Sequence, residues 1–192
     1  SFNLGVPNNS NVSPTVLPGS QLITISEASQ GMMNANGTSN PLGTEVATLF
    51  GSRFNDATAG DGQVVSGEIF AGIGIVGNGT NQTEGAWQYQ LDSKDSWKII
   101  PIVSDQNPFI LLSSSLIRYL PKDTFTGTSG KLTIRLLDGS QNWNAGALNK
   151  PLMIGGSGPA STETLSLGTT IKAAPKVLSL EEGAIVSASA KS

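Results

Sequence analysis

The chain has 192 residues, with 23 glycines and 10 prolines but neither cysteine nor histidine. Without those two side chains it lacks a disulfide framework, a thiolate nucleophile and an imidazole base, which excludes most enzyme mechanisms. A net charge of −3 without a lysine and arginine cluster argues against nucleic acid as a partner, and no apolar run approaches the roughly 20 residues of a membrane span.

The turn-rich composition, with few helix formers at helical spacing, predicts an all-β chain of short strands. Residues 1–20 hold three prolines and little periodicity, so we expect an extended lead-in there and a first strand at 21–25. Residues 31–43 have the composition of a turn-rich link. Residues 45–50 fit either a strand or one helical turn.

The middle of the chain carries the clearest strand signals. Over 69–76 apolar residues alternate with small ones, which indicates that something packs closely against the second face. Trp87 and Tyr89 alternate with glutamines, the pattern of a strand with one buried and one solvated face. Further strands follow at the spacing of about 8–12 residues typical of a sandwich; they are expected at 97–99, 109–112, 116–120, 132–137 and 164–171, with a long loop at 140–162.

Several short motifs follow one another in a fixed order. They are Leu-Phe-Gly-Ser-Arg-Phe-Asn-Asp at 49–56, Gly-Ala-Trp-Gln-Tyr at 85–89, Trp97, Leu-Leu at 111–112, Arg-Tyr-Leu-Pro at 118–121, Phe-Thr-Gly at 125–127 and Leu-Leu-Asp at 136–138. This ordered set resembles the cadherin-like, immunoglobulin-like repeat modules of giant bacterial surface adhesins and hemolysin-type (RTX-like) proteins. The resemblance covers residues 14–171. It implies an immunoglobulin-like antiparallel β-sandwich with extended N- and C-terminal segments.

We therefore expect an extended segment at 1–20, a sandwich at 21–171 and a final segment at 172–192 that repeats features of the start. The final segment is either a linker in a longer array or a strand for a neighbouring copy, which alternate apolar side chains would anchor. Its apolar residues are Val177, Leu178, Leu180, Ile185 and Val186. The expected function is a structural or adhesive module, located at the bacterial cell surface or outside the cell, that works in series with copies of itself.

Acidic positions near module junctions bind calcium in that family, and they make calcium the one candidate cofactor. The candidates here are Glu27, Asp56, Asp61 and Asp138, which fall at expected strand ends or loops. Calcium takes six to eight oxygen ligands, usually several of them carboxylates. The alternative is that these residues cap turns, as the Asp-Gly pairs at 61–62 and 138–139 suggest.

No catalytic residues are expected, so the chain is not predicted to be an enzyme. The carboxylates of Asp92 and Asp95, or of Glu181 and Glu182, form sequence pairs but lack a second catalytic component. We interpret both pairs as solvated turn and end positions.

Trp143 lies in a polar loop without a strand pattern. Either it folds back over one end of the sandwich, or it is exposed for a protein partner or a surface glycan. The second candidate function is therefore a carbohydrate-binding module that uses this loop aromatic. For Trp87, Tyr89 and Trp97 the alternation with polar residues favours packing in the core over a sugar-binding platform.

Overall fold

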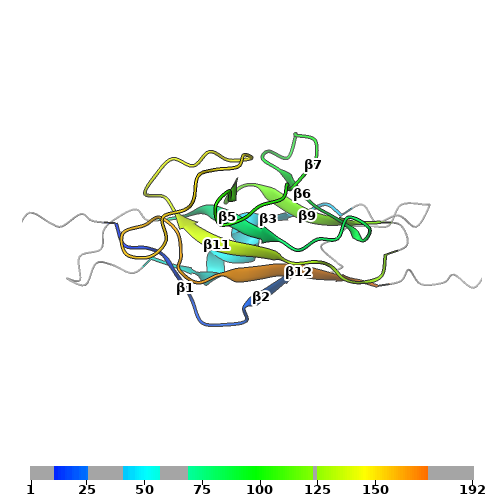
Figure 1. Ribbon diagram of the computed structural model, residues 1–192, viewed down its shortest axis with the longest axis horizontal. Coiled ribbons are helices and arrows are strands. Elements are labelled where there is room, and N and C mark those ends of the chain that lie inside the picture. Colours follow the sequence, from blue (N-terminus) through cyan, green and yellow to red (C-terminus); the bar gives the residue numbers. More distant parts are fainter. Residues whose placement is uncertain (1–10, 26–40, 57–68, 123–124, 173–192) are drawn as a thin grey trace, which may run out of the picture.

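The computed structural model describes residues 11–25, 41–56, 69–122 and 125–172. In these residues most of the regular structure is antiparallel β-strand, and the only α-helix is short. Two main sheets enclose one hydrophobic core, which makes the described chain an all-β sandwich (Figure 1). The link predicted at 31–43 lies partly outside the described ranges, so the structure describes it only from residue 41 onward.

The larger sheet has the strand order β10-β12-β11-β5-β8, and β2 pairs with β12 in parallel while the other pairings are antiparallel. The strands predicted at 21–25, 69–76, 109–112, 132–137 and 164–171 are all present in this sheet, and β10 is an additional strand. The members are β2 (Leu22–Ile25), β5 (Phe70–Asn78), β8 (Phe109–Leu112), β10 (Gly127–Thr128), β11 (Leu132–Asp138) and β12 (Leu165–Ile171).

The smaller sheet has the order β3-β9-β6-β7 and is antiparallel throughout. Its strands are β3 (Thr44–Glu45), β6 (Gly85–Gln90), β7 (Lys98–Ile99) and β9 (Leu116–Pro121). A separate two-stranded sheet pairs β1 (Thr15–Val16) with β4 (Phe54–Asn55). The lead-in predicted as extended therefore contains a short strand.

The segment at 45–50, which fitted a strand or a helical turn, is mostly helical. Helix α1 spans Val46–Phe50 and continues into the 3-10 helix η2 at Gly51–Arg53. Val46 and Phe50 are fully buried, so burial of one apolar side explains why five residues form a helix at all. Within the described residues no helix has the length and apolar character that crossing a membrane requires.

The core between the two sheets is built around large aromatic side chains. Trp87 and Tyr119 meet edge to face with ring centroids 5.2 Å apart, and the Trp87 indole N–H donates to the carbonyl oxygen of Gly130 at 2.8 Å. Both rings are fully buried, and Tyr89 is nearly so. The prediction that Trp87 and Tyr89 pack in the core is confirmed.

The strand expected at 97–99 is present as the two-residue strand β7, but the expectation that Trp97 packs in the core is wrong. Ile99 is 65% exposed, and the buried residue next to it is Ile100, at 2% exposure. Trp97 is only half-buried, and the Arg118 guanidinium carbon lies 4.0 Å from the centroid of its ring. Strand β7 has only two residues, which is too short for alternation to define which side faces inward.

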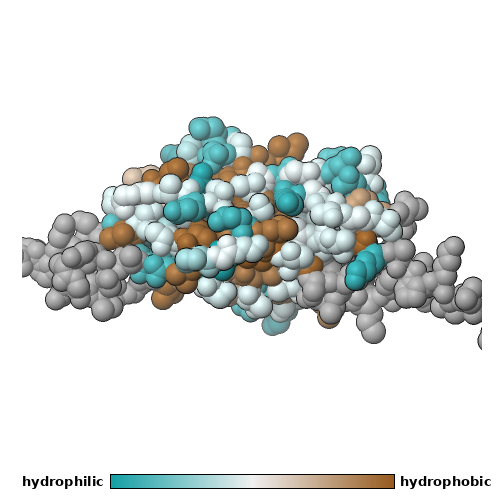
Figure 2. Space-filling model, turned by 90° about the horizontal axis from the view of Figure 1, so that it is seen from below, coloured by the Kyte–Doolittle hydropathy of each residue, from teal (hydrophilic) through white to brown (hydrophobic). Residues whose placement is uncertain are grey.

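The described chain begins at Asn11 and ends at Lys172, and these two points lie at opposite ends of the long axis (Figure 1). Seen from below that view, apolar residues form patches near the middle that polar residues interrupt (Figure 2). Large apolar side chains that are partly exposed include Leu17 and Leu22, at 39% and 38% exposure. The long connection from β11 to β12, yellow to orange in Figure 1, carries the candidate site.

Candidate functional site

Asp138, the last residue of β11, fixes the start of this long connection. Its side chain is fully buried, and its Oδ1 accepts the Ser140 backbone N–H at 2.9 Å and also the Ser140 hydroxyl. Its Oδ2 accepts a hydrogen bond from Nδ2 of Asn11 at 3.0 Å. The carboxylate therefore caps a turn and also ties the N-terminal segment to the loop.

Residues 146–149 of the loop run alongside β8. The backbone N–H of Gly146 donates to the carbonyl oxygen of Ile110 at 2.9 Å, and that of Asn149 donates to Pro108 at 2.8 Å. Phe109 and Leu148 form an isolated antiparallel bridge between these hydrogen bonds. The loop thus covers the edge of the larger sheet, an edge that would otherwise expose unpaired backbone groups.

The loop also covers the outer face of the larger sheet. Ile110, Leu137 and Ala160 form a second, fully buried cluster there, and Trp143 and Leu152 pack against it. This packing confirms the expectation that something lies close against the small residues of 69–76. Both faces of the sheet are therefore buried along β11 and β8, as happens when a layer covers each side.

One alternative for Trp143 was that it folds back over one end of the sandwich. It folds back instead over this outer face of the larger sheet. Its indole N–H donates to the carbonyl oxygen of Asp138 at 2.8 Å, and the ring remains half-buried. The hydrogen bond fixes the ring, while the part that is not covered lines a hollow in the loop. A role for Trp143 in binding a partner stays a prediction.

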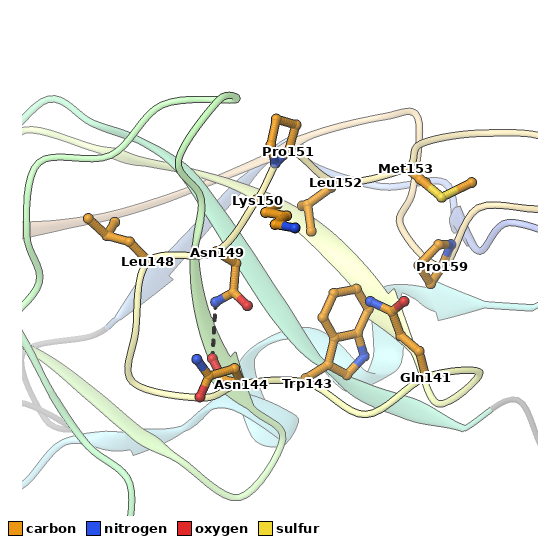
Figure 3. Close-up of a pocket in the computed structure, with 10 residues that line it drawn as sticks. All are labelled: Gln141, Trp143, Asn144, Leu148, Asn149, Lys150, Pro151, Leu152, Met153 and Pro159. Atoms are coloured by element: carbon orange, nitrogen blue, oxygen red, sulfur yellow. Dashed lines mark hydrogen bonds between the residues drawn. The ribbon is translucent and has the colours of Figure 1, made fainter.

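The hollow has a volume of about 450 Å³, within the range of small-molecule sites. In Figure 3 the indole of Trp143 stands between Gln141 on one side and Asn149 on the other, with Lys150 and Leu152 above it. An aromatic surface, three amide side chains and one ammonium group thus line one space; the polar members are Gln141, Asn144, Asn149 and Lys150.

Asn149 is the best fixed of these polar side chains. Its Nδ2 donates to the carbonyl oxygens of Asn144 at 3.0 Å and Ala147 at 2.9 Å. Both amide hydrogens are used inside the loop, so the amide oxygen is the group that remains to accept a hydrogen bond. Gln141 and Lys150 are exposed at the rim, where they can reach a ligand without a change in the loop.

The candidate calcium ligands are only partly described. Asp56 and Asp138 lie in the described residues, whereas Glu27 and Asp61 lie outside them. Among the described residues no three acidic, histidine or cysteine side chains gather as metal ligands would. Asp138 has the turn-capping role that was the alternative, and calcium binding by the full set stays a prediction.

The other residues singled out in the sequence also lie partly inside and partly outside the described residues. Asp92 and Asp95 share one turn, in which Asp92 Oδ1 accepts the Lys94 N–H at 3.0 Å and Asp95 Oδ2 accepts the Asp92 N–H at 3.2 Å. This agrees with their interpretation as solvated turn residues. The carboxylate pair near the C-terminus lies outside the described residues, as do Val177, Leu178, Leu180, Ile185 and Val186.

Sequence reasoning identified Trp143 but missed Gln141, Asn149, Lys150 and Leu152. The signal available was the amide-rich run that surrounds the tryptophan. A loop without periodicity gives no rule for which of its residues face one another. The sequence therefore could not show that these four residues line one hollow with Trp143. No known family model matches this chain, and neither a curated protein nor a solved structure matches it.

Proposed function

We propose that the chain is a non-enzymatic structural or adhesive module of a bacterial cell-surface adhesin or fibre, working outside the cell in series with copies of itself. The placement of Asn11 and Lys172 at opposite ends of the long axis is the observation that carries this proposal (Figure 1). A chain that enters at one end and leaves at the other can be joined head to tail with further copies without crossing back over itself.

The strand order supports an immunoglobulin-like type of sandwich. In that fold one sheet contains strands B, E and D as neighbours, and the other contains G, F and C. The orders β3-β9-β6 and β12-β11-β5 correspond to these two sets in chain order. Strand β8 departs from the pattern, because it pairs with β5 but follows β6 and β7 along the chain.

The parallel pairing of β2 with β12 suits a module under tension. Leu22 to Ile25 lie opposite residues 166–169, and the two strands run in the same direction. A pull on the chain before β2 and after β12 acts in opposite directions along this ladder. The hydrogen bonds of the ladder are then loaded together in shear, not broken one at a time from an end.

An antibody raised against residues 11–172 tests the proposal on cells that make the protein. If the copies are joined in one polypeptide, we expect an immunoblot band well above the 19.8 kDa of this chain. If they are separate subunits, we expect them to form fibres. We also expect protease added to intact cells to remove the signal while a cytoplasmic marker persists. A signal that intact cells protect from protease would refute the surface location and with it the proposed function.

A further inference from the structure

We propose that the hollow beside Trp143 is a carbohydrate site that takes one pyranose ring and prefers an acidic sugar. The inference adds a ligand to the adhesive role, and its biological meaning rests on that proposed function. Sugar binding by the chain is measurable whether or not copies are joined in series, so the two proposals fail separately.

The chemistry of the walls matches the two kinds of surface on a pyranose. One face of such a ring is apolar C–H surface, and its rim carries hydroxyl groups that donate and accept hydrogen bonds. Trp143 offers a large aromatic surface with a fixed position. Asn149 and Gln141 offer amide groups beside it (Figure 3).

The charge of the hollow favours an acidic sugar. Lys150 is the one charged residue among the described residues that line it, so no carboxylate there opposes a negative ligand. A sugar carboxylate at the rim can pair with the ammonium group while the ring stacks on Trp143. Because Lys150 is exposed, this pairing contributes selectivity of a few-fold and not most of the affinity.

The loop holds these groups in place before any ligand arrives. Trp143 is bonded to the Asp138 carbonyl, Asn149 to two carbonyls of the loop, and the backbone of 146–149 to the edge of β8. Leu152 anchors the opposite side against the outer-face cluster. Binding therefore does not have to order a flexible segment, which would weaken the affinity.

A purely apolar ligand fits this hollow less well. It would cover the amide oxygen of Asn149 and the amide of Gln141 without supplying hydrogen bonds in return. Leaving such groups dry and unpaired opposes binding. A sugar hydroxyl satisfies either group, since it both donates and accepts.

The test uses the 192-residue chain and the methyl glycosides of glucose, galactose, mannose, N-acetylglucosamine and glucuronic acid. Saturation-transfer NMR reports which sugar protons lie on the protein, and titration by intrinsic fluorescence gives the dissociation constants. We expect binding with Kd on the order of 1 mM, the range for one small ring. The glucuronide should bind several-fold more tightly than the glucoside.

Variants assign the binding to the hollow. Trp143→Ala should weaken every sugar at least about tenfold, through loss of the stacking surface. Lys150→Ala should bring the ratio of the glucuronide and glucoside constants close to one. Gln141→Ala changes an exposed rim side chain and should weaken binding a few-fold, which keeps the test decisive if Trp143→Ala fails to fold.

Trp97→Ala is the matched control, because Trp97 is a half-buried tryptophan that lies outside the hollow and stacks on Arg118 of the smaller sheet. We expect it to retain sugar binding as long as circular dichroism shows the native fold. Absence of saturation transfer with all five glycosides would overturn the proposal. So would binding that Trp97→Ala abolishes and the Gln141 and Lys150 variants leave intact.

Discussion

A Cβ atom placed on Gly74 would lie 2.7 Å from Cδ1 of Leu152, a residue of the distant loop. The absence of a side chain at Gly74 is what lets Leu152 reach the sheet. We expect Gly74→Ala to push Leu152 out of the outer-face cluster and to lower the free energy of unfolding by about 1 kcal/mol. The cost is moderate because the end of a leucine side chain can move.

Gly72 and Gly168 give the comparison for this prediction. A Cβ at Gly72 would overlap the backbone carbonyl oxygen of Leu111, so Gly72→Ala should cost about 3 kcal/mol or prevent folding. At Gly168 the nearest atom is 3.4 Å away, and alanine should be tolerated. Urea unfolding of the three variants checks the order, and equal stability of the Gly74 and Gly168 variants would contradict the contact with Leu152.

The sequence predicted the longer strands and close packing against the second face of 69–76, but not which segment packs there. Neighbouring residues such as Ile110 and Leu111, or Leu136 and Leu137, are all fully buried. Runs of this kind indicate that both faces of a strand are covered. They do not say by what, because the covering residue Leu152 comes from a loop whose backbone follows contacts and not a repeat.

The capping role of Asp138 predicts the effect of Asp138→Asn. The amide keeps the size of the side chain but replaces one acceptor oxygen with a donor, which then faces either the Ser140 N–H or the Asn11 amide. We expect a loss of about 1–3 kcal/mol in the free energy of unfolding. Thermal melting in the presence of EDTA measures it.

The same variant addresses calcium. If Asp138 only caps the turn, the melting temperatures of the wild type and the variant should differ by the same amount in EDTA and in calcium. A difference that appears only with calcium would instead make Asp138 a metal ligand. Glu163→Gln, an exposed carboxylate of the same loop, is the control for a general effect of charge.

The contacts of Arg118, on strand β9 of the smaller sheet, require a planar guanidinium and not only a positive charge. Its Nε donates to Gln88 Oε1 at 2.8 Å, its Nη1 donates to the Pro41 carbonyl at 2.6 Å, and it stacks on Trp97. Burial lowers the pKa of the Arg118 side chain from its ordinary value. Lysine cannot make this planar set of contacts, so Arg118→Lys should cost about 1–3 kcal/mol.

Urea unfolding measures this loss, and near-ultraviolet circular dichroism reports the environment of Trp97. The exposed Lys98 on strand β7 of the same sheet serves as the control, since Lys98→Arg should change stability by less than about 0.5 kcal/mol. An Arg118→Lys variant as stable as the Lys98 variant would mean that the stack contributes nothing beyond charge.

Tyr119 predicts a loss of stability at alkaline pH. Burial, and to a lesser degree the negative charge of Glu84, raises the pKa of the Tyr119 hydroxyl to about 12. In the unfolded chain the hydroxyl ionises near pH 10. The folded state therefore favours the neutral form, so this contribution to stability is complete below about pH 10 and is lost as the pH rises toward about 12.

Tyr119→Phe isolates this effect from other groups that titrate in the same range. Among the described residues the Tyr119 hydroxyl has no hydrogen-bond partner, so the variant should match or exceed the stability of the wild type at neutral pH. Its advantage should grow above pH 10 in urea unfolding. A gap that stays constant with pH would show that Tyr119 ionises normally in the folded protein.

The shear arrangement of β2 and β12 predicts which contacts set mechanical strength. The Thr169 hydroxyl donates to the Ile25 carbonyl oxygen at 2.9 Å between these strands, and both residues are buried. Thr169→Val keeps the shape but leaves that carbonyl without this hydrogen bond, which should cost about 1–3 kcal/mol. In a tandem of full chains pulled by atomic force microscopy, the mean unfolding force should fall.

Thr170→Val is the control for this pulling experiment, because Thr170 is exposed and contacts Thr128 of β10 instead of β2. It should change the unfolding force much less than Thr169→Val. Equal forces for the wild type and both variants would mean that the load passes through another part of the sandwich. A lower force for Thr169→Val alone would identify the β2–β12 ladder as the element that resists extension, because only this variant removes a bond across it.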